Sequence, residues 1–204
     1  MAQTGMDFTP GGLVGAVLRT IARPQDEAET VMAENLAPGA LWTMLAIVVA
    51  ISVVLGQGSL LLTDPSGGIL TNPYLANPLL MFVVQMAILV VMIFATYHIG
   101  QWMGGMGGFA PTIAVVTWLQ FVLVCVQVVQ TAAMFLLPPL ADLLGIAGLV
   151  LFLWLFTNFV AVLHGFQSLG LVFVMILMSA FGVTFVISLI LTMIGVTAPG
   201  AMNV

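Results

Sequence analysis

Long runs of apolar residues follow one another along most of this chain, and turn-forming residues separate them. The runs cover residues 41–62, 79–103, 111–137, 143–164 and 169–196. Each run reaches the length of about 20 residues that a helix needs to cross a bilayer. The pattern predicts an all-α integral membrane protein with a bundle of five transmembrane helices.

Proline, glycine and small polar residues mark the boundaries between the runs. The separating turns are expected at residues 63–68, 104–108, 138–142 and 165–168. Asp142 stands where the fourth run begins, and we expect it to cap that helix. The resulting division is a cytoplasmic N-terminal segment (1–37), a membrane domain (38–197) and a short external tail (198–204).

Two short helices are expected before the first span. Apolar residues recur at helical spacing at Leu13, Val14, Val17, Leu18 and Ile21. This spacing predicts an amphipathic helix over residues 12–22 that lies on the membrane surface. Pro24 begins a second helix, with Asp26 and Glu27 in the first turn, where the helix dipole favours negative charge. We expect Pro38 to end it. A partly disordered acidic tail is the alternative.

Charged residues make up only 4% of the chain, whereas a soluble domain carries about 25%. The only basic residues are Arg19 and Arg23, both before the first span. A nucleic-acid surface is therefore excluded, because it needs a basic patch to neutralise phosphates. Basic residues accumulate on the cytoplasmic side of membrane proteins, so we expect a cytoplasmic N-terminus. Five spans then place the C-terminus on the external side.

Polar side chains inside the third and fourth spans form a candidate interior. Thr117, Gln120, Gln127 and Thr131 fall on one stripe of the third span, and Asn158 is the only amide of the fourth. A stripe that faces neighbouring helices allows hydrogen bonds and avoids leaving polar groups unsatisfied in hydrocarbon. We interpret these residues as packing contacts. The alternative is that they line a path for a substrate.

The fifth span carries a small residue at every fourth position. These residues are Ala180, Thr184, Ser188 and Thr192. Small residues allow two helix backbones to approach closely in lipid, which predicts a helix–helix contact at this face. The partner helix is either another span of this chain or part of a second copy.

The sequence shows no recognisable catalytic or metal site. It has no His-Glu-x-x-His zinc helix, no Gly-x-Ser-x-Gly nucleophile turn and no phosphate-binding Gly-Lys-Ser loop. Cys125 is the only cysteine, which excludes an intramolecular disulfide. His98 and His164 lie near helix ends without an obvious third metal donor, so we expect hydrogen-bonded roles at the interface. We therefore expect no cofactor, no bound metal and no enzymatic activity.

The order of these parts resembles the Yip (Ypt-interacting protein) domain family in its bacterial branch. The resemblance rests on Ile21-Ala22-Arg23-Pro24 with the acidic helix after it, the proline and glycine loop after the first span, the glycine-rich turn 104–109 and Leu136-Leu137-Pro138. It implies a five-span protein with a cytoplasmic N-terminus in the bacterial cytoplasmic membrane. The chain lacks the Asp-Leu-Tyr-Gly-Pro type motif of the eukaryotic relatives, so the resemblance does not imply a GTPase partner.

These observations favour a non-enzymatic scaffold or accessory protein that binds or organises other membrane components. Its expected partners are the lipid bilayer and either another membrane protein or further copies of itself, with no nucleic acid. The alternative is a small-solute channel or transporter lined by the polar face of the third span.

Overall fold

The computed structural model describes residues 9–63 and 76–193. This part of the chain forms seven helices and contains no strand. The helices are α1 (Pro10–Ala22), α2 (Pro24–Ala33), α3 (Pro38–Thr63), α4 (Pro78–Trp102), α5 (Phe109–Leu136), α6 (Pro138–His164) and α7 (Leu169–Met193). The last five are long and apolar enough to cross a membrane. The predicted all-α class with five spans is confirmed.

Prolines start most of these helices rather than stopping them. Pro24, Pro38, Pro78 and Pro138 are each the first residue of a helix, where the missing backbone N–H costs nothing and the fixed φ suits the helix. The prediction that Pro38 ends the second helix is therefore wrong. Helix α2 already ends at Ala33, and Asn35 follows in the left-handed region with φ 45°.

The connection between α5 and α6 is much shorter than predicted. Only Leu137 separates the two helices, and it adopts extended dihedral angles before Pro138 begins α6. The expected turn at 138–142 is wrong, because these residues already belong to the helix. Asp142 is consequently an exposed residue of the second turn of α6, and the N-cap is Leu137, which makes no side-chain capping bond.

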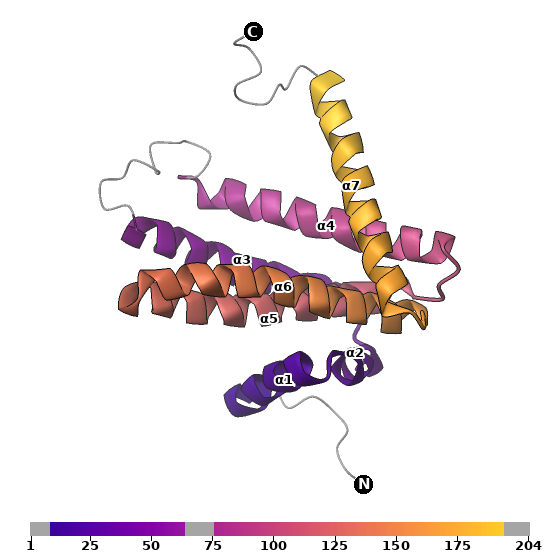
Figure 1. Ribbon diagram of the computed structural model, residues 1–204, viewed down its shortest axis with the longest axis horizontal. Coiled ribbons are helices and arrows are strands. Elements are labelled where there is room, and N and C mark those ends of the chain that lie inside the picture. Colours follow the sequence, from indigo (N-terminus) through magenta and orange to yellow (C-terminus); the bar gives the residue numbers. More distant parts are fainter. Residues whose placement is uncertain (1–8, 64–75, 194–204) are drawn as a thin grey trace.

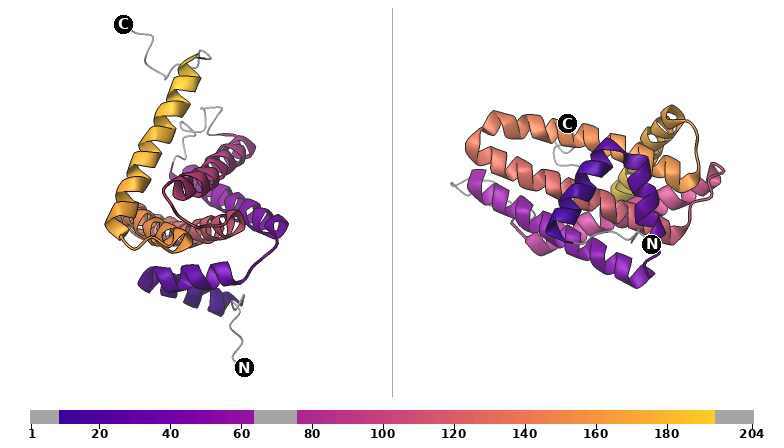
Figure 2. Two further views of the ribbon diagram at one scale, coloured as in Figure 1. Left: turned by 90° about the vertical axis from the view of Figure 1, so that its right-hand side faces the viewer. Right: turned by 90° about the horizontal axis from the view of Figure 1, so that it is seen from below.

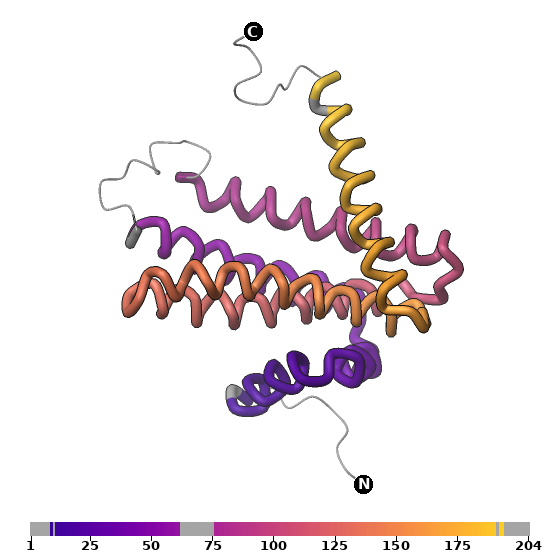
Figure 3. The backbone as a smooth tube through the Cα atoms, in the orientation of Figure 1, coloured from indigo at the N-terminus to yellow at the C-terminus, as the bar shows by residue number. Residues whose placement is uncertain are grey.

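Helices α3 to α6 lie side by side and alternate in direction (Figures 1 and 3), and α5 contacts each of the other three. In the most apolar stretch of α5, 61% of the residues are buried, against 6% in α7. The core lies between α3, α5 and α6. Its fully buried side chains include Leu45, Val49, Ile113, Leu119, Val122, Leu155 and Phe159. Helix α5 thus organises the bundle, because every other long helix except α7 packs against it.

Helix α7 packs on α6 and α4 near its beginning and then leans away from the bundle (Figure 2, left). The turn before it depends on Gly165, which caps α6 in the left-handed region with φ 74°. On the same side, Gly104 has φ 92° just after α4 ends. The expected glycine turns thus fall between helices.

Helices α1 and α2 form a hairpin that lies across the side of α5 and α6 (Figure 2, right). Ala16, Thr20 and Ala28 are completely buried in this contact. The outer side of α1 remains exposed at Val14, Leu18 and Ile21. Of the predicted apolar stripe, Val17 is therefore buried against the protein, whereas Val14, Leu18 and Ile21 are exposed.

Several sequence predictions concern residues outside the described ranges. They are most of the turn at 63–68, the last residues of the span predicted to end at 196, and the tail 198–204.

Candidate functional site

The α1–α2 hairpin is attached to the bundle by two polar contacts. The indole Nε1 of Trp118 in α5 donates to Thr20 Oγ1 at 3.0 Å, and that hydroxyl donates in turn to Ala16 O. The Gln25 amide in α2 donates to Asn158 Oδ1 in α6, also at 3.0 Å. Asn158 is 2% exposed, and its own amide donates to Trp154 O. The buried polar groups of Thr20, Trp118 and Asn158 therefore have partners across the junction or within their own helix.

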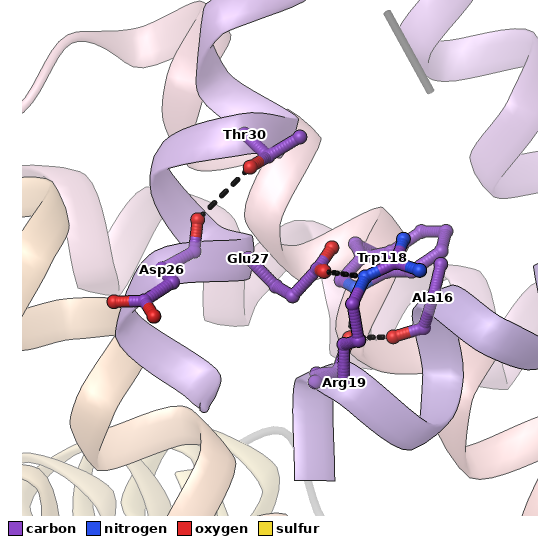
Figure 4. A network of polar contacts seen from close by, with 7 residues as sticks. Ala16, Arg19, Asp26, Glu27, Thr30 and Trp118 are labelled. Atoms are coloured by element: carbon purple, nitrogen blue, oxygen red, sulfur yellow. Dashed lines mark hydrogen bonds and ion pairs between the residues drawn. The ribbon is translucent and has the colours of Figure 1, made fainter. Parts of the chain in front are cut away.

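Within the hairpin, Arg19 of α1 forms an ion pair with Glu27 of α2 (Figure 4). The Arg19 side chain is largely exposed, whereas the Glu27 carboxylate is buried. One carboxylate oxygen of Glu27, Oε2, is buried without a hydrogen-bond partner. The pairing is consequently asymmetric, because the exposed arginine provides the one strong contact that a buried carboxylate has.

A polar cluster joins α3, α4 and α5 inside the bundle. Ser52 Oγ donates to Gln127 Oε1 at 2.9 Å, and the Gln127 amide donates back to Ser52 O at 3.0 Å. Gln85 of α4 donates to the same Ser52 hydroxyl at 3.2 Å. Three helices are thereby joined by hydrogen bonds at one residue, Ser52, through its hydroxyl and its backbone carbonyl. Such contacts hold helices together where little water competes.

The other residues of the predicted stripe on α5 have different surroundings. The hydroxyl of Thr131 in α5 lies 3.1 Å from the hydroxyl of Ser59 in α3. Gln130, which lies beside this stripe one turn after Gln127, donates to Ala141 O in α6 at 3.2 Å. Thr117 and Gln120 are buried, and the Thr117 hydroxyl has no partner. The stripe therefore does not face one common space, and Asn158 belongs to the hairpin junction instead.

His164, the last residue of α6, is enclosed by one glycine of α4, Gly100, and two of the α4–α5 connection, Gly105 and Gly107. A Cβ added to Gly105 or Gly107 would lie within 2.7 Å of the His164 side chain, and one added to Gly100 would lie even closer to the ring. The Gly107 N–H donates to Nδ1 at 3.3 Å, so Nε2 carries the proton and donates to Thr96 O at 3.1 Å. His164 thus holds the end of α6 against the end of α4 and the connection that follows it.

His98 has a contrasting position on the exposed side of α4. Its ring stacks on Phe94 and meets the edge of Tyr97. Among residues 9–63 and 76–193, no three side chains of His, Cys, Asp or Glu come close enough to bind one metal ion together.

The small residues of α7 are exposed in the structure. Ala180, Thr184, Ser188 and Thr192 contact no other long helix closely enough to be buried. Ala180 and Thr184 also line an apolar cleft of about 520 Å³ between α4, α6 and α7. The Thr192 hydroxyl donates to Ser188 O within α7. This face is therefore open to a further helix or to lipid.

A comparison with protein families matches residues 18–197 to the model of the Yip1 domain. The chain belongs to the Yip1 family. The matched region begins within α1 and includes the hairpin junction, the Ser52 cluster, the His164 enclosure and the face of α7. The five long apolar helices of this chain agree with a membrane protein. Comparisons with curated proteins and with solved structures gave no match for this Yip1-family chain.

Several residues of these contacts have no strong signal in the sequence. Ser52, Gln85 and Gln25 are single polar residues whose partners are remote in sequence. For the enclosure of His164, the sequence indicated only its two parts, a histidine at a helix end and a glycine-rich turn about sixty residues earlier. Only the fold shows that these two segments meet.

Proposed function

We propose that this Yip1-family chain is a non-enzymatic scaffold that binds other membrane components through α7. The observation that supports this most is the exposed row of small residues on α7, a helix that leans away from its own bundle (Figure 1). An apolar helix with small residues on one face allows a second transmembrane helix to approach its backbone closely. The second helix belongs to another membrane protein or to another copy of this chain.

The interior contacts agree better with a scaffold than with a transport path. Gln127 is paired with Ser52, and Asn158 is paired with Gln25 from the hairpin. Side chains that lined a path for a solute would need to be free to bind it. The alternative, a small-solute channel or transporter along the polar face of α5, requires these pairs to open.

Site-directed crosslinking tests the scaffold proposal. The single native cysteine is replaced by Cys125→Ala, and one cysteine is introduced in α7 as Thr184→Cys or Ser188→Cys. The matched control is Val186→Cys, which is exposed on another side of the same helix. We expect crosslinked products in native membranes from Thr184→Cys and Ser188→Cys at least about fivefold above the control, because close helix contacts are limited to one face.

Equal crosslinking at all three positions would argue against a specific contact at α7. The transport alternative is tested with the purified protein in liposomes and in planar bilayers. Solute flux or conductance that Gln127→Leu abolishes would replace the scaffold proposal with a channel or transporter.

We further propose that the protein is bacterial and resides in the cytoplasmic membrane, with the N-terminus inside and the C-terminus outside. Support comes from Arg19 and Arg23, the only basic residues, which both precede the first span. Topology reporters fused after Ser168 and after Val204 test this orientation. A cytoplasmic signal is expected at Ser168 and an external signal at Val204, and the reverse pattern would contradict the proposal.

A further inference from the structure

Helix α7 is apolar on every side. It contains no charged residue, and large apolar side chains are exposed around it at Phe181, Val186 and Ile187. A helix at the membrane surface needs a polar face, whereas a helix that is apolar all round belongs in a protein core or in hydrocarbon. Only 6% of the most apolar stretch of α7 is buried inside the protein. Hydrocarbon is therefore the environment that suits α7.

The direction of α7 differs from that of its neighbours. Helices α4 and α6 run alongside each other, whereas α7 runs steeply across them (Figure 1). Its 25 residues span about 37 Å, enough to cross a hydrocarbon core of about 30 Å. Transmembrane helices lie within about 40° of the bilayer normal. The three helices can therefore span one bilayer together only when α7 turns to run alongside α4 and α6.

The connection before α7 provides a pivot for this turn. Gly165 caps α6 in the left-handed region with φ 74°, and Phe166 stays attached to the bundle by stacking on the His164 ring. Gln167 and Ser168 follow, and both are exposed. A few residues between two elements are sufficient to absorb the change of backbone angles in a hinge. Helix α7 can thus turn while the end of α6 keeps its contacts.

The apolar cleft of about 520 Å³ between α4, α6 and α7 lies on the side toward which α7 would turn. Its α7 wall includes Ala180 and Thr184. Its α4 wall includes Ala87 and Ala95, with Val91 between them. Small residues on both walls allow the two helix backbones to approach closely in lipid. The two walls are therefore suited to each other.

The walls also match along their length. Gly100 of α4 and Val172 of α7 both line the cleft and are buried, whereas Ala87 and Thr184 line it and are exposed. Ala87 lies thirteen residues before Gly100, and Thr184 lies twelve residues after Val172. Both are thus roughly 18–20 Å from the buried end of the cleft. An α7 that turns toward α4 meets it in antiparallel direction and brings Thr184 opposite Ala87.

We infer that α7 is a movable helix that closes this cleft in the bilayer by packing antiparallel against α4. The closed position covers Ala180 and Thr184. One consequence rests on the scaffold function proposed above: a partner helix reaches these two residues only while α7 is open. Closure and partner binding then exclude each other at this face, so closure regulates the access of the partner.

Disulfide formation within single molecules tests the closed position. The full-length protein carries Cys125→Ala with Ala87→Cys and Thr184→Cys, and it is oxidised in phosphatidylcholine nanodiscs that hold one copy each. A disulfide requires two Cα atoms within about 7 Å, so it reports an α7 that lies on α4. The matched control is Ala87→Cys with Val186→Cys, because Val186 is exposed on another side of α7. We expect at least about fivefold more disulfide than in the control.

Two further pairs test the antiparallel register. Val91→Cys with Ala180→Cys should also form the disulfide, because these residues lie nine before Gly100 and eight after Val172. Ala87→Cys with Ala180→Cys should form little, because these two residues are about 6 Å out of register along the helices. All the substituted residues of α4 and α7 are exposed, so the core packing of the variants is preserved.

Equal disulfide formation in the matched and mismatched pairs would overturn the inference, because α7 would then have no fixed closed position. A disulfide that forms as readily between two proteins, one with Ala87→Cys and one with Thr184→Cys, mixed in liposomes would also overturn it. A second copy would then cover the cleft. Since the nanodiscs contain no partner, a failure of the scaffold proposal in native membranes leaves this result unaffected, and the two failures are distinguishable.

Discussion

The Gln25 amide donates a hydrogen bond to Asn158 Oδ1 at 3.0 Å, which joins α2 to α6 across 133 positions of the sequence. With the contact between Trp118 and Thr20, it fastens the N-terminal hairpin to the side of the bundle. The hairpin is thus packed on the side of the helix bundle, and single substitutions can remove its two hydrogen bonds to the bundle separately.

Removal of the Gln25 amide should loosen the hairpin. Gln25→Met leaves Asn158 Oδ1 buried without its donor, which we expect to destabilise the attachment by about 1–3 kcal/mol. Hydrogen exchange should become faster in α1 and α2 while α5 is unchanged. Thr30→Val is the matched control, because Thr30 in α2 bonds only to Asp26 O of its own helix. Faster exchange throughout the chain would contradict a local role.

In the ion pair within the hairpin, a second substitution at Glu27 should restore part of the stability that a substitution at Arg19 removes. Arg19→Gln leaves the buried Glu27 carboxylate without its cationic partner and should destabilise the protein by about 1–2 kcal/mol, a modest value because Arg19 is mostly exposed. Adding Glu27→Gln should recover part of this loss, since the neutral amide costs less to bury. Thermal unfolding measures both, with Arg23→Gln as the control. A double variant less stable than Arg19→Gln would contradict this reasoning.

The enclosure of His164 predicts that a glycine-to-alanine substitution has opposite effects on stability at Gly100 and at Gly58. Gly100→Ala places a methyl group against the His164 ring and should destabilise the protein by about 1–3 kcal/mol. Gly58→Ala in α3 meets no atom within 4 Å and should instead stabilise it by about 0.5–1 kcal/mol, because alanine favours the helix. Thermal unfolding in detergent compares them.

Adding His164→Ala separates the clash from a general effect at Gly100. We expect Gly100→Ala to cost much less stability in a protein that already carries His164→Ala, since the ring that opposes the methyl group is absent. The same cost in both backgrounds would show that Gly100 does not contact His164.

The Ser52 cluster should contribute measurably to bundle stability. Gln127→Leu removes both hydrogen bonds between α5 and Ser52 and should destabilise the bundle by about 1–2 kcal/mol, in the range of polar contacts between membrane helices. Val128→Leu at the adjacent exposed position is the control. The free energy of unfolding from detergent titration gives the comparison. Equal stability of the two variants would mean that the cluster is energetically neutral.

Much of the architecture follows from local properties of the chain. The five spans were predictable because each apolar run must satisfy its backbone hydrogen bonds internally in lipid, whatever it packs against. The glycine turns around Gly104 and Gly165 were predictable for a similar reason, since glycine readily adopts positive φ. Helix boundaries at prolines were harder, because proline both ends one helix and begins the next. The one-residue connection at Leu137 illustrates this.

The contacts that distinguish this protein depended on tertiary structure. Helical periodicity predicted a polar stripe on α5, but it could not show that Gln127 meets Ser52 and that the Thr117 hydroxyl is buried without a partner. Likewise, the pattern of α1 indicated an amphipathic helix without indicating that its polar Thr20 faces Trp118. A sequence pattern determines which side of a helix is suited for contact. Which helix meets that side depends on packing between segments far apart in the chain, because apolar spans of similar composition are locally interchangeable.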